Sequence, residues 1–235
     1  MQPKYKRILL KLSGEALAGE KGFGLNQDVI AGVVDQIVEI HAMGVEVGLV
    51  IGGGNFWRGR QGTKMDRTTA DHMGMLATVM NSLAMMDAIE QRGVAVRVQT
   101  ALNMVSLAEP FILRKAIRHF EEGRIVIFAC GTGNPYCSTD TAAALRACET
   151  GADILLMAKN VDGIYDSDPK TNPYAKKYDR LTYSDIINRG LKVIDFTAAT
   201  MCMENNVPTL AFGLDENRSI VRAVCGEELG TVITV

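Results

Sequence analysis

The chain has 235 residues, of which 47% are hydrophobic and 22% charged, and its formal net charge is −2 at pH 7. This composition is typical of a globular protein that buries a substantial core. The nearly balanced charge gives no reason to expect nucleic acid or a membrane surface as the main partner, and no apolar run approaches the roughly 20 residues that span a bilayer. Five widely spaced cysteines without a C-x-x-C pair favour reduced thiols in a cytoplasmic protein over a disulfide framework or a zinc site.

Strands and helices are predicted to alternate along most of the chain. Near-continuous apolar strands separated by helices favour a mainly parallel sheet covered on both faces, that is, a three-layer α/β/α sandwich. We expect one domain over residues 1–235, with two lobes that meet near residue 150 as the alternative. Strands are expected at 8–12, 45–51, 94–98, 125–130 and 153–157, helices at 27–43, 68–91, 110–122 and 141–148, a polar segment at 159–179, and shorter elements at 183–189, 197–206, 209–212, 217–224 and 231–235.

The most informative loop is Gly131–Asp140, which follows an apolar strand and leads into an alanine-rich helix. A helix that begins at the end of a strand presents free backbone N–H groups, and its dipole attracts phosphate. Ser138 and Thr139 add hydroxyl donors, and Asp140 adds a carboxylate at the helix start. The simpler interpretation is a connection with an Asn-Pro turn.

Two further strand ends carry loops that suit an anion. Lys11 ends the first strand beside Ser13 and Gly14, although an edge lysine that reaches water is an equally good interpretation. The run Gly52–Gly54 lets a ligand approach the backbone closely, and Arg58 follows it. Neither the G-x-G-x-x-G dinucleotide pattern nor the G-x-x-x-x-G-K-[ST] phosphate loop occurs. Because ligands of open parallel sheets bind at the carboxyl ends of strands, we expect the three loops to converge.

A fourth loop, Asn160–Pro169, is rich in aspartate. Its spacing lacks the D-x-D-x-D-G pattern and terminal Glu of a calcium loop, so a solvated turn is the simplest interpretation. Tyr165 beside carboxylates would also suit an adenine and a ribose.

Several segments together resemble the bacterial uridylate kinases of the amino-acid kinase superfamily. They occur in the family's order from about residue 5 to the C-terminus, and the block Asp71-His72-Met73-Gly74 separates uridylate kinases from the aspartate, glutamate and carbamate kinases. The resemblance implies the amino-acid kinase fold and ATP-dependent, Mg²⁺-requiring phosphorylation of UMP to UDP by a homohexamer. The segments that carry it are Lys11–Leu17, Gly52–Asn55, Asp71–Thr78, Thr132–Pro135 and Val161–Gly163.

The resemblance also implies roles for individual residues. The segment Gly19, Glu20, Lys21, Gly22, Phe23 and Gly24 is similar to the family's GTP-response region, and members are typically activated by GTP and inhibited by UTP. The residues implied in ATP binding are Lys11, Leu12, Ser13, Gly14, Gly54, Arg58, Asn160, Tyr165 and Asp168. Those implied in UMP binding are Gly53, Asp71, Thr132, Gly133, Asn134, Pro135, Tyr136, Cys137, Ser138 and Thr139.

The chemistry expected of these residues needs no strong base, because the acceptor is a phosphate oxygen already ionised at neutral pH. We expect Lys11, aided by Arg58, to bind the transferring phosphoryl group, Asp140 to orient Lys11 or the metal, and Asp71 to accept hydrogen bonds from the ribose. Mg²⁺ would lie mostly on nucleotide phosphates and water, so no dedicated protein metal site is expected. The competing hypotheses are a carboxylate or carbamate kinase of the same fold and a non-catalytic nucleotide sensor.

Overall fold

The computed structural model describes residues 2–57, 64–169, 171–191 and 194–235, and a nine-stranded sheet is its main feature. The strands of this sheet are β1 (Arg7–Leu12), β2 (Glu46–Ile51), β3 (Val96–Thr100), β4 (Glu109–Pro110), β5 (Ile125–Ala129), β6 (Ile154–Lys159), β9 (Arg180–Thr182), β10 (Thr209–Gly213) and β11 (Thr231–Thr234), while β7 (Ile164–Tyr165) and β8 (Lys177–Tyr178) form a separate hairpin.

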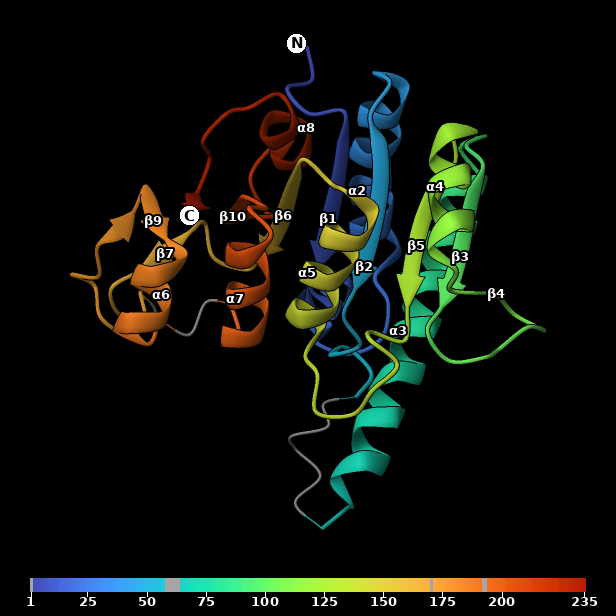
Figure 1. The fold of residues 1–235 in the computed structure, drawn as a ribbon, viewed down its shortest axis with the longest axis horizontal. Coiled ribbons are helices and arrows are strands. Elements are labelled where there is room, and N and C mark those ends of the chain that lie inside the picture. The colour runs from blue at the N-terminus through green and yellow to red at the C-terminus, as the bar shows by residue number, and fades with distance from the viewer. Residues whose placement is uncertain (1, 58–63, 170, 192–193) are drawn as a thin grey trace.

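The order of strands across the sheet is β4-β3-β5-β2-β1-β6-β10-β11-β9 (Figure 1). Neighbours are parallel from β4 to β10, the pair β10–β11 is antiparallel, and β11 is parallel to β9. The prediction of a mainly parallel sheet is therefore confirmed. Since β1 lies between β2 and β6, the sheet joins strands from both sides of residue 150.

Helices cover both faces of the sheet, as the apolar strands required. Along β1, Ile8, Leu10 and Leu12 belong to one buried core and Leu9 to the other, because successive side chains of a strand point to opposite faces. The first core is completed by α2 (Gln27–Ala42), α3 (Arg67–Glu90) and α8 (Ser219–Val224), and the second by α4 (Leu113–Glu121), α5 (Thr139–Thr150), α6 (Tyr183–Arg189) and α7 (Phe196–Glu204).

The helix boundaries follow local capping chemistry. The Asn26 side chain accepts hydrogen bonds from the backbone N–H groups of Asp28 and Val29, which begins α2 where the sequence predicts it. Ser138 caps α5 in the same way through the N–H of Thr141, and Gly151 ends that helix with φ of 64°.

Several details of the predicted elements differ from the structure. The helix expected from residue 110 begins at Leu113, because Glu109 and Pro110 pair with β3 and the Phe111 N–H donates to the Thr100 carbonyl. The strand expected at 94–98 lies at Val96–Thr100, and the hairpin β7–β8 lies within the polar segment. Two short elements after β1 were not expected: α1 (Gly14–Leu17) and the 3-10 helix η1 (Gly19–Lys21).

Candidate active site

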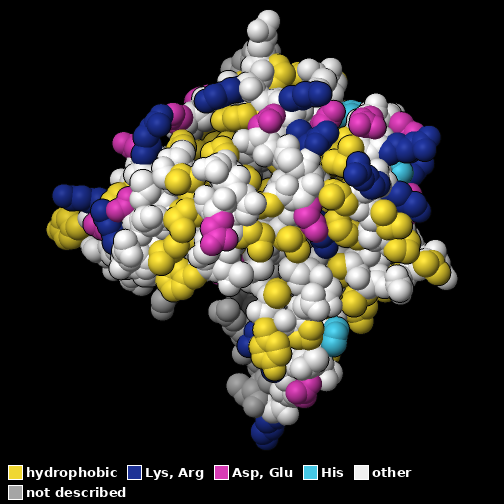
Figure 2. Space-filling model, in the orientation of Figure 1, with side chains coloured by type: hydrophobic (Ala, Val, Ile, Leu, Met, Phe, Trp, Pro, Cys, Tyr) yellow, Lys and Arg dark blue, Asp and Glu magenta, His cyan; other side chains and the backbone are white. Residues whose placement is uncertain are grey.

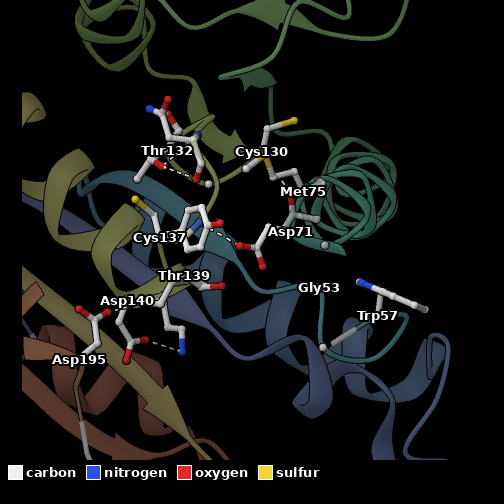
Figure 3. A pocket seen from close by; sticks show the side chains of 18 of the residues that line it. Gly53, Trp57, Asp71, Met75, Cys130, Thr132, Cys137, Thr139, Asp140 and Asp195 are labelled. Atoms are coloured by element: carbon white, nitrogen blue, oxygen red, sulfur yellow. Dashed lines mark hydrogen bonds and ion pairs between the residues drawn. The ribbon is translucent and has the colours of Figure 1, made fainter. Parts of the chain in front are cut away.

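A cavity of about 610 Å³ opens at the carboxyl ends of β1, β2 and β5. Lys11, Gly53 and Thr139 all line it, so the three loops expected to converge do so (Figure 3). Residues of α3 form a further wall, and this helix extends well beyond the margin of the sheet (Figure 1). The cavity therefore lies where parallel sheets place their ligands.

The cavity contains a partly buried ion pair. Lys11 Nζ, at the end of β1, lies 2.9 Å from Asp140 Oδ1 in the first turn of α5, and their side chains are 12% and 18% exposed. Burial alone would raise the pKa of Asp140, but the charges of Lys11 and Lys159 more than offset burial and hold that pKa below its usual range. Lys11 is thus paired inside the site, which removes the interpretation of an edge lysine in water.

The glycine turn after β2, residues Gly52–Gly54, packs closely against its surroundings. A Cβ atom at Gly53 would lie 2.8 Å from both the Gly74 carbonyl oxygen and the Ala77 Cβ of α3. A Cβ at Gly14 would lie 2.3 Å from the Gly52 carbonyl oxygen. Glycine is required at these positions because backbone approaches backbone, which leaves the cavity edge free of side chains.

Replacing Gly53 with alanine is expected to destabilise the fold by about 1–3 kcal/mol, because α3 must move away from the turn. Gly32 is the matched control. It lies inside α2, and a Cβ atom added there would have no neighbour within 4 Å, so Gly32→Ala should be neutral or stabilising by up to about 1 kcal/mol. Urea unfolding of both variants measures the difference, and equal stabilities would refute the packing argument.

The loop before α5 has a strained but well-anchored backbone. Cys130 and Tyr136 have φ of 65° and 69°, and Gly131 and Gly133 have φ of 59° and 80°. The Cys130 N–H donates to Thr78 Oγ1 on α3 at 2.8 Å, which fixes the start of the loop. Non-glycine residues with positive φ persist where the surrounding structure enforces them, which is common at ligand sites.

Asp71 connects α3 to this loop. Its Oδ2 atom accepts hydrogen bonds from the Tyr136 backbone N–H at 2.9 Å and from Arg67 Nε at 2.8 Å, and the Arg67 guanidinium lies over the Tyr136 ring. Most residues predicted to bind UMP therefore line this one cavity (Figure 3). From that prediction, Gly53, Asp71, Thr132, Asn134, Tyr136, Cys137, Ser138 and Thr139 line the cavity, and Gly133 and Pro135 lie in the same loop.

Asp195, which was not predicted from the sequence, lines the cavity opposite α3 (Figure 3). Its carboxylate accepts hydrogen bonds from the hydroxyls of Ser138 and Thr141, and from the Ala198 N–H at 2.9 Å. One carboxylate thus joins the N-terminal ends of α5 and α7. The position of Asp195 directly before Phe196 is typical of a helix N-cap. No sequence pattern indicates that its carboxylate also binds the loop before α5, which lies more than fifty residues earlier in the chain.

Most residues predicted for ATP lie outside the cavity. Of those that the structure describes, only Lys11 and Gly54 line it; Arg58 lies outside the described residues. Leu12, Ser13 and Gly14 continue directly from Lys11 into α1. Asn160 and Asp168 are exposed, and Tyr165 lies on β7, where its hydroxyl donates to Asp162 Oδ1 at 2.7 Å. The residues predicted to bind ATP therefore lie partly in the cavity and partly on or near the β7–β8 hairpin.

The Gly19–Gly24 segment is tied to the glycine turn. The Asn55 side-chain amide donates to the Gly24 carbonyl at 2.8 Å, and the Gly24 N–H donates to the Asn55 carbonyl at 3.0 Å. Asn55 is also paired with Asn81 of α3, whose amide donates to the Gly52 carbonyl at 2.6 Å. Phe23 is 68% exposed and meets the Phe56 ring edge-on.

Comparison with known proteins gives the family. The amino acid kinase family model matches residues 6–212. The chain belongs to the amino acid kinase family. Family membership agrees with the predicted three-layer fold and with a cavity at the carboxyl ends of the central strands.

Solved structures of this family resemble the chain over nearly its whole length. The UMP kinase from Bacillus anthracis has a TM-score of 0.94 and 39% identity, over 98% of this chain and 96% of that one. The UMP kinase from Ureaplasma parvum has a TM-score of 0.93 and 37% identity, over 99% and 100%. The uridylate kinase from Archaeoglobus fulgidus is more distant, with a TM-score of 0.73 and 28% identity over 96% and 99%.

The described part of the chain contains no helix that is both long and apolar enough to cross a membrane. Within the same residues, no group of three or more His, Cys, Asp or Glu side chains is arranged to hold a metal ion.

Proposed function

We propose that this protein transfers the γ-phosphoryl group of ATP to UMP and releases UDP and ADP. The observation that carries the proposal is the near full-length similarity to two UMP kinases at 39% and 37% identity. It is supported by the convergence in one cavity of Lys11, the glycine turn and the loop at the start of α5.

In the proposed reaction, a phosphate oxygen of UMP attacks the γ-phosphorus of ATP, and the bond from that phosphorus to the β–γ bridging oxygen breaks. No proton has to be removed from the acceptor, so alignment and charge stabilisation supply most of the catalysis. Lys11 provides a fixed positive charge for the transferring group, and Arg58 is proposed to assist it. Asp140 orients the Lys11 ammonium through their 2.9 Å contact.

The UMP phosphate is proposed to bind at the N-terminus of α5, where Ser138, Thr139 and Asp140 line the cavity. Asp71 is proposed to accept hydrogen bonds from the ribose hydroxyls. The remaining UMP contacts are proposed for the loop from Thr132 to Cys137 and for Gly53. ATP is proposed to extend from Lys11 and Gly54 toward Asn160, Tyr165 and Asp168.

Mg²⁺ is proposed to enter with ATP. Its preferred ligands are oxygen atoms, and it usually keeps water and substrate phosphates rather than a full set of protein ligands. When bound, it neutralises part of the charge on the phosphates. Asp140 and Asp195 line the cavity but are engaged by Lys11 and by Ser138, Thr141 and the Ala198 N–H, so the ion is proposed to rest on phosphate oxygens and water.

Assembly and regulation are proposed from the resemblance and from the surface of α3. Leu76 and Met80 on this helix are each 47% exposed, and the part of the molecule built around α3 projects from the body with hydrophobic side chains on its surface (Figure 2). We propose that α3 contributes to subunit contacts of a homohexamer, that GTP activates through Gly19–Gly24, and that UTP inhibits. Residues 1–235 are proposed to act as one domain in the cytoplasm, where the five free thiols would stay reduced.

Incubation of the purified protein with ATP, Mg²⁺ and UMP should yield UDP, separated by ion-exchange chromatography, and CMP and AMP should be poor acceptors. Aspartate, glutamate and carbamate test the related kinases of this fold. Phosphorylation of one of those acceptors in preference to UMP would overturn the proposal. Binding of UMP without any UDP formation would favour a nucleotide sensor.

A further inference from the structure

Lys159 and Lys11 project from the same face of the sheet. Lys11 of β1 is paired with Met157 of β6, and Lys159 follows Met157 by two residues on the same strand. Because side chains two apart on a strand point the same way, Lys159 lies on the face that carries Lys11. Met157 belongs to the core that α5 and α7 complete, so both lysines face these two helices.

The charged groups around Lys159 form a compact cluster at this edge of the sheet. Asp140 is on α5 and pairs with Lys11, while Asp195 precedes α7 and is bound by the hydroxyls of Ser138 and Thr141. Lys159 is half-buried and interacts electrostatically with Lys11, Asp140 and Asp195. Two lysines and two aspartates give this cluster a net charge of zero when all four are ionised.

The cluster explains why a second lysine is needed. With Lys159 neutral, two carboxylates would be balanced by Lys11 alone, and the net charge of −1 would repel an incoming polyphosphate. A buried carboxylate that loses its cation is also strongly disfavoured. Lys159 is not among the residues that line the cavity, so its effect passes through its neighbours.

We infer that Lys159 is a positioning residue for phosphoryl transfer, which offsets Asp140 and Asp195 so that the positive charge of Lys11 remains directed at the phosphates. This inference rests on the proposed kinase function. It goes beyond the residues implied by the family resemblance, none of which is Lys159.

The inference gives a defined dependence on pH. Burial, reinforced by the charge of Lys11, lowers the pKa of Lys159 to about 8, while Asp140 and Asp195 act in the opposite direction. Lys11 on β1, Asp140 on α5 and Asp195 before α7 are the described charged groups that shift this pKa. Below pH 8 Lys159 is charged and the cluster is balanced; above pH 8 it loses its proton and the cluster becomes negative. The phosphate groups, whose second pKa is about 6, do not titrate in that window.

The test is the pH profile of kcat/KM for ATP between pH 7 and 9.5 in the wild type, Lys159→Arg and Lys159→Gln. The wild type should lose activity above about pH 8. Lys159→Arg should stay within about threefold of the wild type at pH 7 and lose the alkaline decline, because guanidinium remains charged. Lys159→Gln should fall by about 30-fold at pH 7, because Lys11 alone would then balance the two carboxylates and less of its charge would act on the phosphates. Lys115→Gln, on the exposed surface of α4, should match the wild type.

Binding of a non-hydrolysable ATP analogue gives a readout without turnover. At pH 8 the wild type should take up about half a proton on binding, measured by calorimetry in two buffers of different ionisation enthalpy, since the phosphates raise the pKa of Lys159. Lys159→Arg should take up none. The inference is overturned by a wild-type profile that is flat to pH 9.5, or by a Lys159→Arg protein that keeps the alkaline decline and the proton uptake. A wild type that makes no UDP at any pH would instead overturn the proposed function.

Discussion

Replacing Lys11 with methionine is expected to lower kcat for UDP formation by about 10²–10³-fold. The methionine side chain keeps most of the volume but removes the charge proposed to stabilise the transferring phosphoryl group, and loss of one such donor at a reacting oxygen typically costs this much. The KM for UMP should change little, because UMP is assigned to the loop before α5. Steady-state kinetics with varied ATP and UMP measure both parameters.

The control for this variant is Lys6→Met. Lys6 is exposed next to the opposite end of the same strand, so the Lys6→Met protein should retain full activity. Circular dichroism separates loss of chemistry from loss of fold, since Asp140 is left without its 2.9 Å partner. A folded Lys11→Met protein with kcat within a factor of five of the wild type would exclude Lys11 from the transfer step.

Replacing Asp71 with asparagine is expected to raise the KM for UMP by about 10–100-fold, with a much smaller change in kcat. A hydrogen bond to a charged group contributes about 1.5–3 kcal/mol, which corresponds to that range of affinity. The wild type should also prefer UMP over 2′-deoxy-UMP, and the variant should lose most of this preference. Competition kinetics with the two nucleotides measure the ratio.

Asp87→Asn serves as the matched control, because Asp87 lies on the same helix, is exposed, and uses its carboxylate to accept a hydrogen bond from the Gln91 side chain. Asp71 also accepts the Tyr136 N–H at 2.9 Å. An asparagine oxygen can keep that hydrogen bond, so the loop should stay in place. An unchanged discrimination between UMP and its deoxy form would assign the ribose to another residue.

The sheet was predictable because its strands are buried on both faces. Runs such as Ile125–Ala129 are apolar throughout, and helices with clear caps at Asn26 and Ser138 separate them. Elements that depend on tertiary pairing were not predictable. The chain at Glu109–Pro110 is extended because it pairs with β3, and nothing in its own composition prevents a helix from beginning there.

The site was predictable as a set of loops but not as a set of contacts. Lys11 and Asp140 could each be named from the sequence, whereas their ion pair depends on packing between β1 and α5. Asp195 reads as an ordinary helix cap, and its second function of holding Ser138 follows only from the approach of α7 to α5. In the sequence, Lys159 is one more polar residue at a strand end, and only the register places it on the same face of the sheet as Lys11.

The amide pair of Asn55 and Asn81 has a mechanical consequence. Because Asn55 holds the backbone at Gly24 and Asn81 holds the carbonyl of Gly52, the outer loop and the floor of the pocket are linked through two buried side chains. A molecule that binds near Phe23 therefore has a direct route for displacing the glycine turn at the edge of the cavity. Loss of the Asn55–Asn81 hydrogen bonds would uncouple the position of the Gly19–Gly24 segment from that of the glycine turn.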